Sequence, residues 1–235
     1  MKNNSVHIQF DEYIQSGMYL LFDNSQKLSL TKNEIELFSQ DLWRDLSKLP
    51  ADIREAADFS LCPICPEKEK RGICPALHPV LPFLNIIDKY NSFDRVTAIY
   101  KGEDNEVLHV SDTAMATALQ YISTLSLMYY CRTGRKYWRY YFGINPLMNA
   151  REVRQRVYLN IYWLYKGDLR AIDRNISTFK NELKITSVSQ IKRLHLICKN
   201  DAFINAFANT HISADILSFD MEEDMEEAFN NFDNV

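Results

Sequence analysis

Residues 113–131 read TAMATALQYISTLSLMYYC and predict one long helix. Apolar side chains would face almost every direction around this helix, and a helix that is apolar nearly all round is usually buried. We therefore expect it to run through the centre of the domain, starting after an N-cap at Asp112 and ending at Cys131.

Short runs of β-forming residues precede this central helix. The expected strands cover residues 5–10, 17–23 and the two arms of a hairpin within 95–111. Apolar residues alternate there on either side of polar turns, which is typical of antiparallel pairs. Thr31 and Glu34 fit a capping box for a helix over 32–47. Prolines near the start of residues 79–91 are compatible with a further helix.

Helical periodicity continues from Asn149 almost to residue 217, with separate helices expected after the first one over 168–184, 187–200 and 201–217. Its first helix places four apolar residues on one stripe, Val153, Val157, Ile161 and Leu164. Gly167 fits the end of that helix. Strands in the first half and helices in the second predict an α+β fold, in which a small antiparallel β-sheet packs against a mostly helical C-terminal half.

The distribution of charge separates a body from a tail. The ending from Asp215 to Val235 carries eight acidic residues and no basic one, whereas the whole chain has a formal net charge of only −4. We expect residues 1–217 to form a single α+β domain and residues 218–235 to form an acidic, flexible tail.

The composition is typical of a globular protein, with 46% hydrophobic and 25% charged residues among 235. No apolar run reaches the roughly 18 residues of a membrane span, and the start MKNNSVHIQFDEY lacks the apolar core of a signal peptide. We therefore expect no membrane partner and a cytoplasmic location. The five cysteines are an odd number. In a reducing compartment, clustered cysteines indicate metal or redox chemistry rather than disulfides.

A Cys-rich loop at residues 61–78, LCPICPEKEKRGICPALH, is the clearest chemical signal. Two cysteines separated by two residues, as in Cys62 and Cys65, are typical of a tetrahedral zinc site, and Cys74 supplies a third ligand. The fourth ligand is either Cys131 or His78. We favour Cys131, because a ligand from the central helix would tie the loop to the core.

Other readings of these cysteines are weaker. Buried thiols can serve as small hydrophobic residues, but the charged stretch PEKEKRG makes the loop too polar for that. A redox dithiol would need a surrounding βαβ pattern, and haem ligation would need a second axial ligand. Cys198 is expected in the core. A closed set of four ligands predicts structural rather than catalytic zinc, and the chain has no G-x-S-x-G or H-E-x-x-H motif, so we lean against an enzyme.

The order of these features resembles an uncharacterised family of small bacterial proteins. CPICP, a short charged loop, CPA, a helix, a hairpin and a long apolar helix follow one another as in that family, over residues 60–217. The family pattern ends with a cysteine in a Ser-Gly-Cys-Pro step, whereas this chain reads YYCRTGRKYW, so the fourth ligand stays open. The resemblance implies a fold and no activity.

Two functions remain open from the sequence. The first is a zinc-stapled interaction or regulatory module that binds another protein. The second is nucleic-acid binding through the basic, aromatic segment 132–156, where arginines can neutralise phosphates and aromatic rings can stack on bases. Its candidate residues are Arg132, Arg135, Lys136, Trp138, Arg139, Arg151, Arg154 and Arg156.

Overall fold

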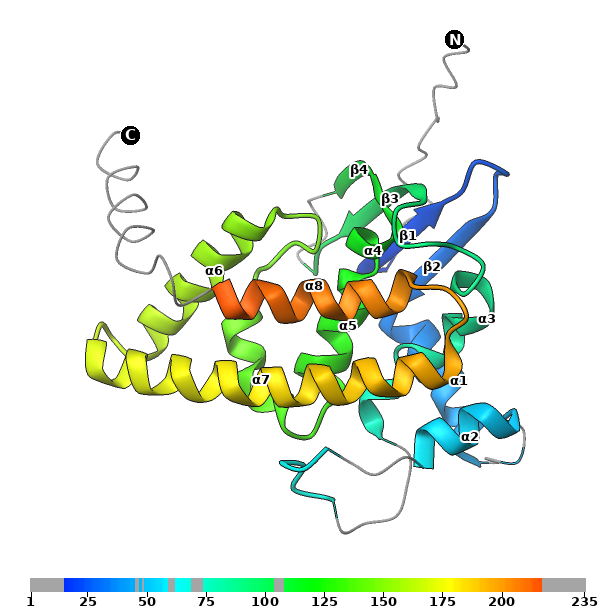
Figure 1. The fold of residues 1–235 in the computed structure, drawn as a ribbon. Helices are drawn as coiled ribbons and strands as arrows, with labels where there is room; N and C mark the ends of the chain where they lie inside the picture. Colours follow the sequence, from blue (N-terminus) through cyan, green and yellow to red (C-terminus); the bar gives the residue numbers. More distant parts are fainter. Residues whose placement is uncertain are drawn as a thin grey trace.

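The computed structural model describes residues 15–44, 47, 49–58, 62–68, 74–103 and 108–216 (Figure 1). The strands are β1 (Gly17–Leu21), β2 (Lys27–Thr31), β3 (Arg95–Lys101) and β4 (Leu108–Ala114). Between β2 and β3 lie α1 (Lys32–Arg44), α2 (Ala51–Asp58), the short 3₁₀ helices η3 (Pro75–Leu77) and η4 (Leu81–Phe83), and α3 (Leu84–Ile87).

Every element of the described chain after β4 is a helix. They are α4 (Met115–Ala118), α5 (Gln120–Thr124), the π-helix η5 (Leu125–Tyr130), the 3₁₀ helix η6 (Gly134–Tyr141), α6 (Ala150–Leu164), α7 (Leu169–Ile197) and α8 (Ala202–Ile216). This distribution confirms the predicted α+β fold. Among the helices of the described ranges, none combines the length and the apolar character needed to cross a bilayer.

The sheet is antiparallel throughout, with strand order β2-β1-β3-β4. The hairpin within 95–111 is confirmed as β3 and β4. The prediction of strand 17–23 holds as β1, which pairs with β3 on one side and, on the other, with β2, a strand that sequence reasoning missed. Residues 5–10 lie outside the described ranges. Helix α1 starts at the predicted cap. The backbone N–H of Glu34 donates to Thr31 Oγ1 over 3.3 Å, as expected of an N-cap at Thr31.

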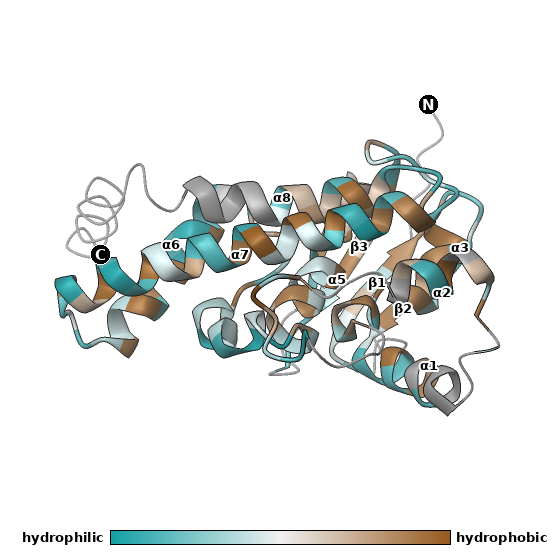
Figure 2. Ribbon diagram, turned by 60° about the horizontal axis from the view of Figure 1, so that its bottom comes forward, coloured by the Kyte–Doolittle hydropathy of each residue, from teal (hydrophilic) through white to brown (hydrophobic). Residues whose placement is uncertain are grey.

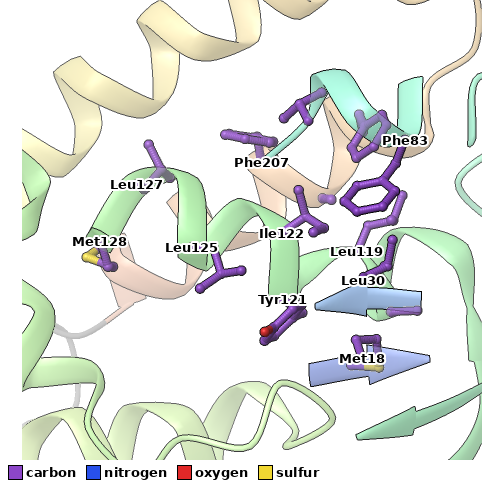
Figure 3. Packing of buried hydrophobic residues seen from close by; sticks show 14 of the residues in the cluster. Met18, Leu30, Phe83, Leu119, Tyr121, Ile122, Leu125, Leu127, Met128 and Phe207 are labelled. Carbon is purple, nitrogen blue, oxygen red and sulfur yellow. The ribbon is translucent and has the colours of Figure 1, made fainter. Parts of the chain in front are cut away.

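The central helix is buried as predicted, and its side chains form the middle of the core. Figure 3 shows Met18 of β1 and Leu30 of β2 below Leu119 and Ile122, with Phe207 of α8 on the other side. The helix is not one continuous α-helix, since α4, α5 and η5 follow one another with different hydrogen-bond patterns. Its N-cap is Ala114, and the prediction of Asp112 was wrong because that residue pairs within β4.

Two long helices cover the C-terminal half, with α7 and α8 side by side in Figure 1. Helix α6 begins at a capping box of Asn149 and Glu152, and the chain leaves it before Gly167, which has a φ of 75°. Helix α7 is one helix of 29 residues where the sequence pattern suggested two. Figure 2 shows mostly hydrophobic strands β1 and β2, whereas α6 and α7 alternate between hydrophilic and hydrophobic turns.

The stretch 79–91 is helical but broken. It contains η4 and α3 instead of one helix, since the prolines divide it into short turns. The acidic tail at 218–235 lies outside the described residues.

Candidate metal centre

Cys62 and Cys65 lie on one tight turn, as their spacing predicted. The backbone N–H of Cys65 donates to the Cys62 carbonyl over 2.9 Å, and the backbone N–H of Ile64 stabilises the thiolate form of Cys62. Both side chains are buried, at 7% and 8% exposure. The turn therefore points its two thiols into the protein.

Cys74 directly precedes η3 and has an extended backbone. The backbone N–H of Leu77 donates to the Cys74 carbonyl over 3.0 Å, which closes the first turn after the cysteine. The sulfur of Cys74 accepts a hydrogen bond from Gln190 Nε2 on α7 over 3.2 Å. A residue from the second half of the chain thus contacts the Cys-rich loop.

Cys131 follows the last residue of η5, and the π-helix positions it. Its backbone N–H donates to the Ser126 carbonyl, five residues earlier, over 2.9 Å. The backbone N–H of Gly134 donates to the Cys131 sulfur over 3.4 Å. Gly134 lies so close to the Leu127 carbonyl that an added Cβ would sit 1.8 Å from the oxygen, so only glycine fits there.

Contacts between side chains and loops join the segments that carry these cysteines. Each contact links a residue near Cys131 to a residue near one of the other cysteines: Ser126 Oγ to the Ala76 carbonyl over 2.5 Å, Thr133 Oγ1 to the Ile64 carbonyl over 3.3 Å, and Arg132 Nε to Glu67 Oε2 over 3.2 Å. Cys74 and Cys131 pack in one cluster with Ala76. We call Cys62, Cys65, Cys74 and Cys131 the thiol cluster.

Cys62 lies within electrostatic reach of the other three thiols. Burial raises the pKa of Cys62, and the neighbouring Cys65 and Cys74 raise it further, while the charge of Arg193 lowers it. Burial also raises the pKa of Cys131 to about 11. Its backbone donors lower this pKa by a smaller amount, and the nearby Cys74 and Cys62 raise it slightly. At neutral pH these two thiols therefore hold their protons unless a cation displaces them.

No disulfide joins any of the five cysteines, all of which the structure describes. Within the described ranges, no three His, Cys, Asp or Glu side chains stand close enough together to hold a metal as they are. Metal binding would have to draw the four sulfur atoms inward. The donor set fits zinc, since thiolates are the ligands of structural zinc sites and backbone N–H groups already point at Cys62 and Cys131.

His78 and Cys198 occupy different surroundings. The His78 ring lies 5.7 Å from that of Tyr130, and burial followed by the charge of Arg132 lowers the pKa of the imidazole to about 4. Cys198 caps the end of α7, where burial, with a smaller effect of Asp88, raises its pKa to about 12. The contacts above group Cys131, rather than either of these residues, with the loop cysteines.

The basic segment divides into core aromatics and surface cations. Three of its tyrosines are buried against Phe179, at ring distances of 4.9, 5.2 and 6.2 Å: Tyr137, Tyr140 and Tyr141. Lys136 Nζ lies 2.6 Å from a carboxylate oxygen of Glu182, and Arg132 contacts Glu67 as described. Arg135, Arg151 and Arg156 are exposed, and Arg154 is half-buried. Trp138 is 39% exposed, and the Arg139 guanidinium lies 5.6 Å from its ring.

Sequence reasoning missed the polar residues of α7 that border the thiol cluster. Gln190 and Arg193 lie on the same buried stripe of α7 as Ile176, Phe179 and Leu183. Polar residues at positions where the helical pattern expects apolar ones were therefore the signal that could have identified them.

Comparisons of the chain with protein-family models, with curated proteins and with solved structures find no match.

Proposed function

We propose that the protein is a non-enzymatic, cytosolic interaction module that binds another protein and whose Cys-rich loop is held to the helical core by structural zinc. The thiol cluster would supply the four ligands. Zinc would contribute no reaction there, because four thiolates leave no open coordination position for a substrate.

One observation carries this proposal. Four buried thiols lie on segments that hydrogen bonds join to one another, and backbone N–H groups point at the sulfurs of Cys62 and Cys131. Four merely hydrophobic thiols would need no such donors. Donors aimed at sulfur stabilise thiolates, and thiolates are the form that binds metal.

An exposed apolar tip supports a protein partner. Trp163 and Leu164 end α6 and Leu169 begins α7, with exposures of 76%, 38% and 58%. Tryptophan is enriched among the residues that dominate binding energy in protein interfaces. The tip is built on two helices, so a partner would meet a surface whose backbone is already ordered.

Metal analysis of untagged protein tests the proposal. We expect about one Zn²⁺ per chain, in line with one four-ligand site. Native alkylation should leave Cys62, Cys65, Cys74 and Cys131 unmodified until a chelator removes the metal. Protein without metal, whose four thiols react readily under native conditions, would overturn the zinc site.

Nucleic-acid binding is the second candidate, and one observation favours it. Trp138 and Arg139 form an exposed aromatic and cationic pair of the type that stacks on unpaired bases. The burial of Tyr137, Tyr140 and Tyr141 weighs against it, because those rings cannot reach a base. Binding of single-stranded RNA that falls steeply with salt, and that Trp138→Ala reduces, would favour this candidate.

A further inference from the structure

A cavity of about 390 Å³ opens where the end of β3 faces the central helix and the loop over 142–148. This volume lies toward the lower end of the range for small-molecule pockets, which suits a ligand of one or two rings. Aromatic side chains from the sheet, the central helix and the end of η6 line it: Tyr100, His109, Tyr121, Tyr129, Tyr141 and Phe142. Such a lining favours a flat, apolar ring system.

Two of these tyrosines are buried, and no described residue hydrogen-bonds their hydroxyl groups. Tyr121 and Tyr141 are 8% and 7% exposed, and both line the cavity. Figure 3 shows the hydroxyl of Tyr121 on the side of its ring that faces away from Leu119 and Ile122. Because buried polar groups normally have a hydrogen-bond partner, these two hydroxyls are available to a bound molecule.

Both hydroxyls keep their protons at neutral pH. Burial raises the pKa of Tyr121, and the neighbouring Tyr100 and Glu103 raise it further. Burial also raises the pKa of Tyr141. Each hydroxyl can therefore donate a hydrogen bond to an oxygen atom of a ligand.

A lysine at the opening of the cavity already holds a carboxylate. Lys32 Nζ lies 2.6 Å from Glu103 Oε1 and 5.1 Å from the centre of the Tyr129 ring. The side chain of Glu103 is 71% exposed, and exposed ion pairs contribute little, so it can turn into solvent at small cost. The charged residues of the described lining are two lysines and one acid, Lys32, Lys101 and Glu103. This balance favours an anionic ligand.

We propose that this cavity binds a small aromatic carboxylate of one or two fused rings. The rings would lie among the aromatic side chains, and the carboxylate of the ligand would replace that of Glu103 at Lys32. Tyr121 would donate to the same carboxylate, and Tyr141 to an oxygen substituent on the ring. No residue of the described lining is a cysteine, so this site goes beyond the proposed function and does not depend on zinc.

Binding of β-naphthoate, a carboxylate with two fused rings, tests the site in the full-length protein. We expect isothermal titration calorimetry to show submillimolar affinity, as a ligand of this size allows. β-Naphthamide has the same rings and no charge. It should bind about fivefold more weakly or worse, because hydrogen bonds to charged groups are the stronger ones.

Two variants and their matched controls test the residues that would hold the carboxylate. Lys32→Met should weaken β-naphthoate binding about tenfold, whereas Lys27→Met, at the exposed start of β2, should leave it unchanged. Tyr121→Phe keeps the ring, removes the hydroxyl and should also weaken binding about tenfold. Tyr90→Phe is its control, since Tyr90 stacks on Phe22 and is absent from the cavity lining.

Glu103→Gln tests the exchange of one carboxylate for another. The change removes a charge that competes with the ligand for Lys32, so affinity for β-naphthoate should rise about twofold to fivefold. Affinity for β-naphthamide should stay the same, because the amide does not compete for the ammonium group.

A measurement on the wild-type protein locates the probe and does not depend on any variant. Nuclear Overhauser effects should connect protons of bound β-naphthoate to the rings of Tyr121 and Tyr141. Absence of saturable binding, equal affinity for β-naphthamide, contacts with other tyrosines only, or equal losses in Lys32→Met and Lys27→Met would each overturn the proposal.

Discussion

Gln190 and Cys74 are joined by a buried N–H···S contact of 3.2 Å, although they stand 116 positions apart in the chain. The contact fixes the Cys-rich loop against α7, which belongs to the helical half. Together with the Ser126–Ala76 contact to the central helix, it makes the cysteines a junction between the two halves of the fold. Disturbing this junction should therefore affect the stability of the whole protein.

Replacing a cysteine of the thiol cluster should lower thermal stability far more than replacing Cys198. At a structural zinc site the free energy of metal binding is also free energy of folding. We expect Cys65→Ser to lower the melting temperature by roughly 10 °C or more, and Cys198→Ser by about 3 °C or less. Calorimetry of the zinc-loaded proteins measures both. Equal shifts would indicate buried thiols without a metal.

The fourth ligand can be assigned with two variants. Cys131 packs against the Cys74 segment, while His78 lies beside Tyr130 and Arg132. We therefore expect Cys131→Ala to lose zinc and His78→Ala to retain it, as measured by metal content after dialysis against a chelator. The opposite result would assign the site to His78 and would also remove the need for a tetrathiolate.

Gly134 should tolerate no side chain. In Gly134→Ala the new Cβ would meet the Leu127 carbonyl at 1.8 Å, and relieving this clash would move the N–H that faces Cys131. We expect a loss of about 3 kcal/mol in the free energy of unfolding. Gly143→Ala is the matched control, since nothing lies near its Cβ and only its φ of 69° opposes alanine, at about 1 kcal/mol. Similar losses in urea denaturation would refute the steric argument.

His78 should make stability depend on pH in a defined window. Its pKa is about 4 in the folded protein and about 6.5 in an unfolded chain, so the unfolded state binds more protons between these values. Stability from this residue is complete above pH 6.5 and is lost as the pH falls toward 4, by at most about 3 kcal/mol. His78→Gln should show a shallower decline over that window. Parallel declines in denaturation curves of the two zinc-loaded proteins would contradict this prediction.

The acidic tail should compete with nucleic acid or acidic partners for the basic segment. Deletion of residues 220–235 removes seven acidic residues and changes the formal net charge from −4 to +3. A tethered tail acts at roughly millimolar effective concentration, so its removal should strengthen binding of a fluorescent single-stranded oligonucleotide, most of all at low salt. Equal binding by both proteins, or none by either, would show that the tail does not cover the segment.

Much of the fold was predictable because its signals are local. Alternation around Val96 and Ala98 specifies β3, and the cap at Thr31 specifies the start of α1. Strand β2 was missed because KLSLT is short and runs directly into that cap. The sequence pattern divided α7 near Ser187 and Ser189, but their hydroxyls donate to the Lys184 and Ile185 carbonyls of the same helix, so they are accommodated without a break.

The candidate site was predictable in part. Short-range spacing indicated Cys62, Cys65 and Cys74, because two residues between cysteines is a local geometric requirement of a metal turn. The place of Gln190 beside Cys74 could not follow from spacing, since it depends on how α7 packs across the core. Polar residues at the positions of a largely apolar helical stripe are nevertheless visible in the sequence before any packing is known.

The π-helix before Cys131 also determines how this chain should be aligned with any relative. A π-turn holds one more residue than an α-turn, so it marks an insertion absorbed inside a helix. A relative whose helix is α-helical throughout would need one residue fewer between its apolar helix and its cysteine. The gap in such an alignment belongs within Leu125–Tyr130, where the helix takes up the extra residue, and not in the loop that follows.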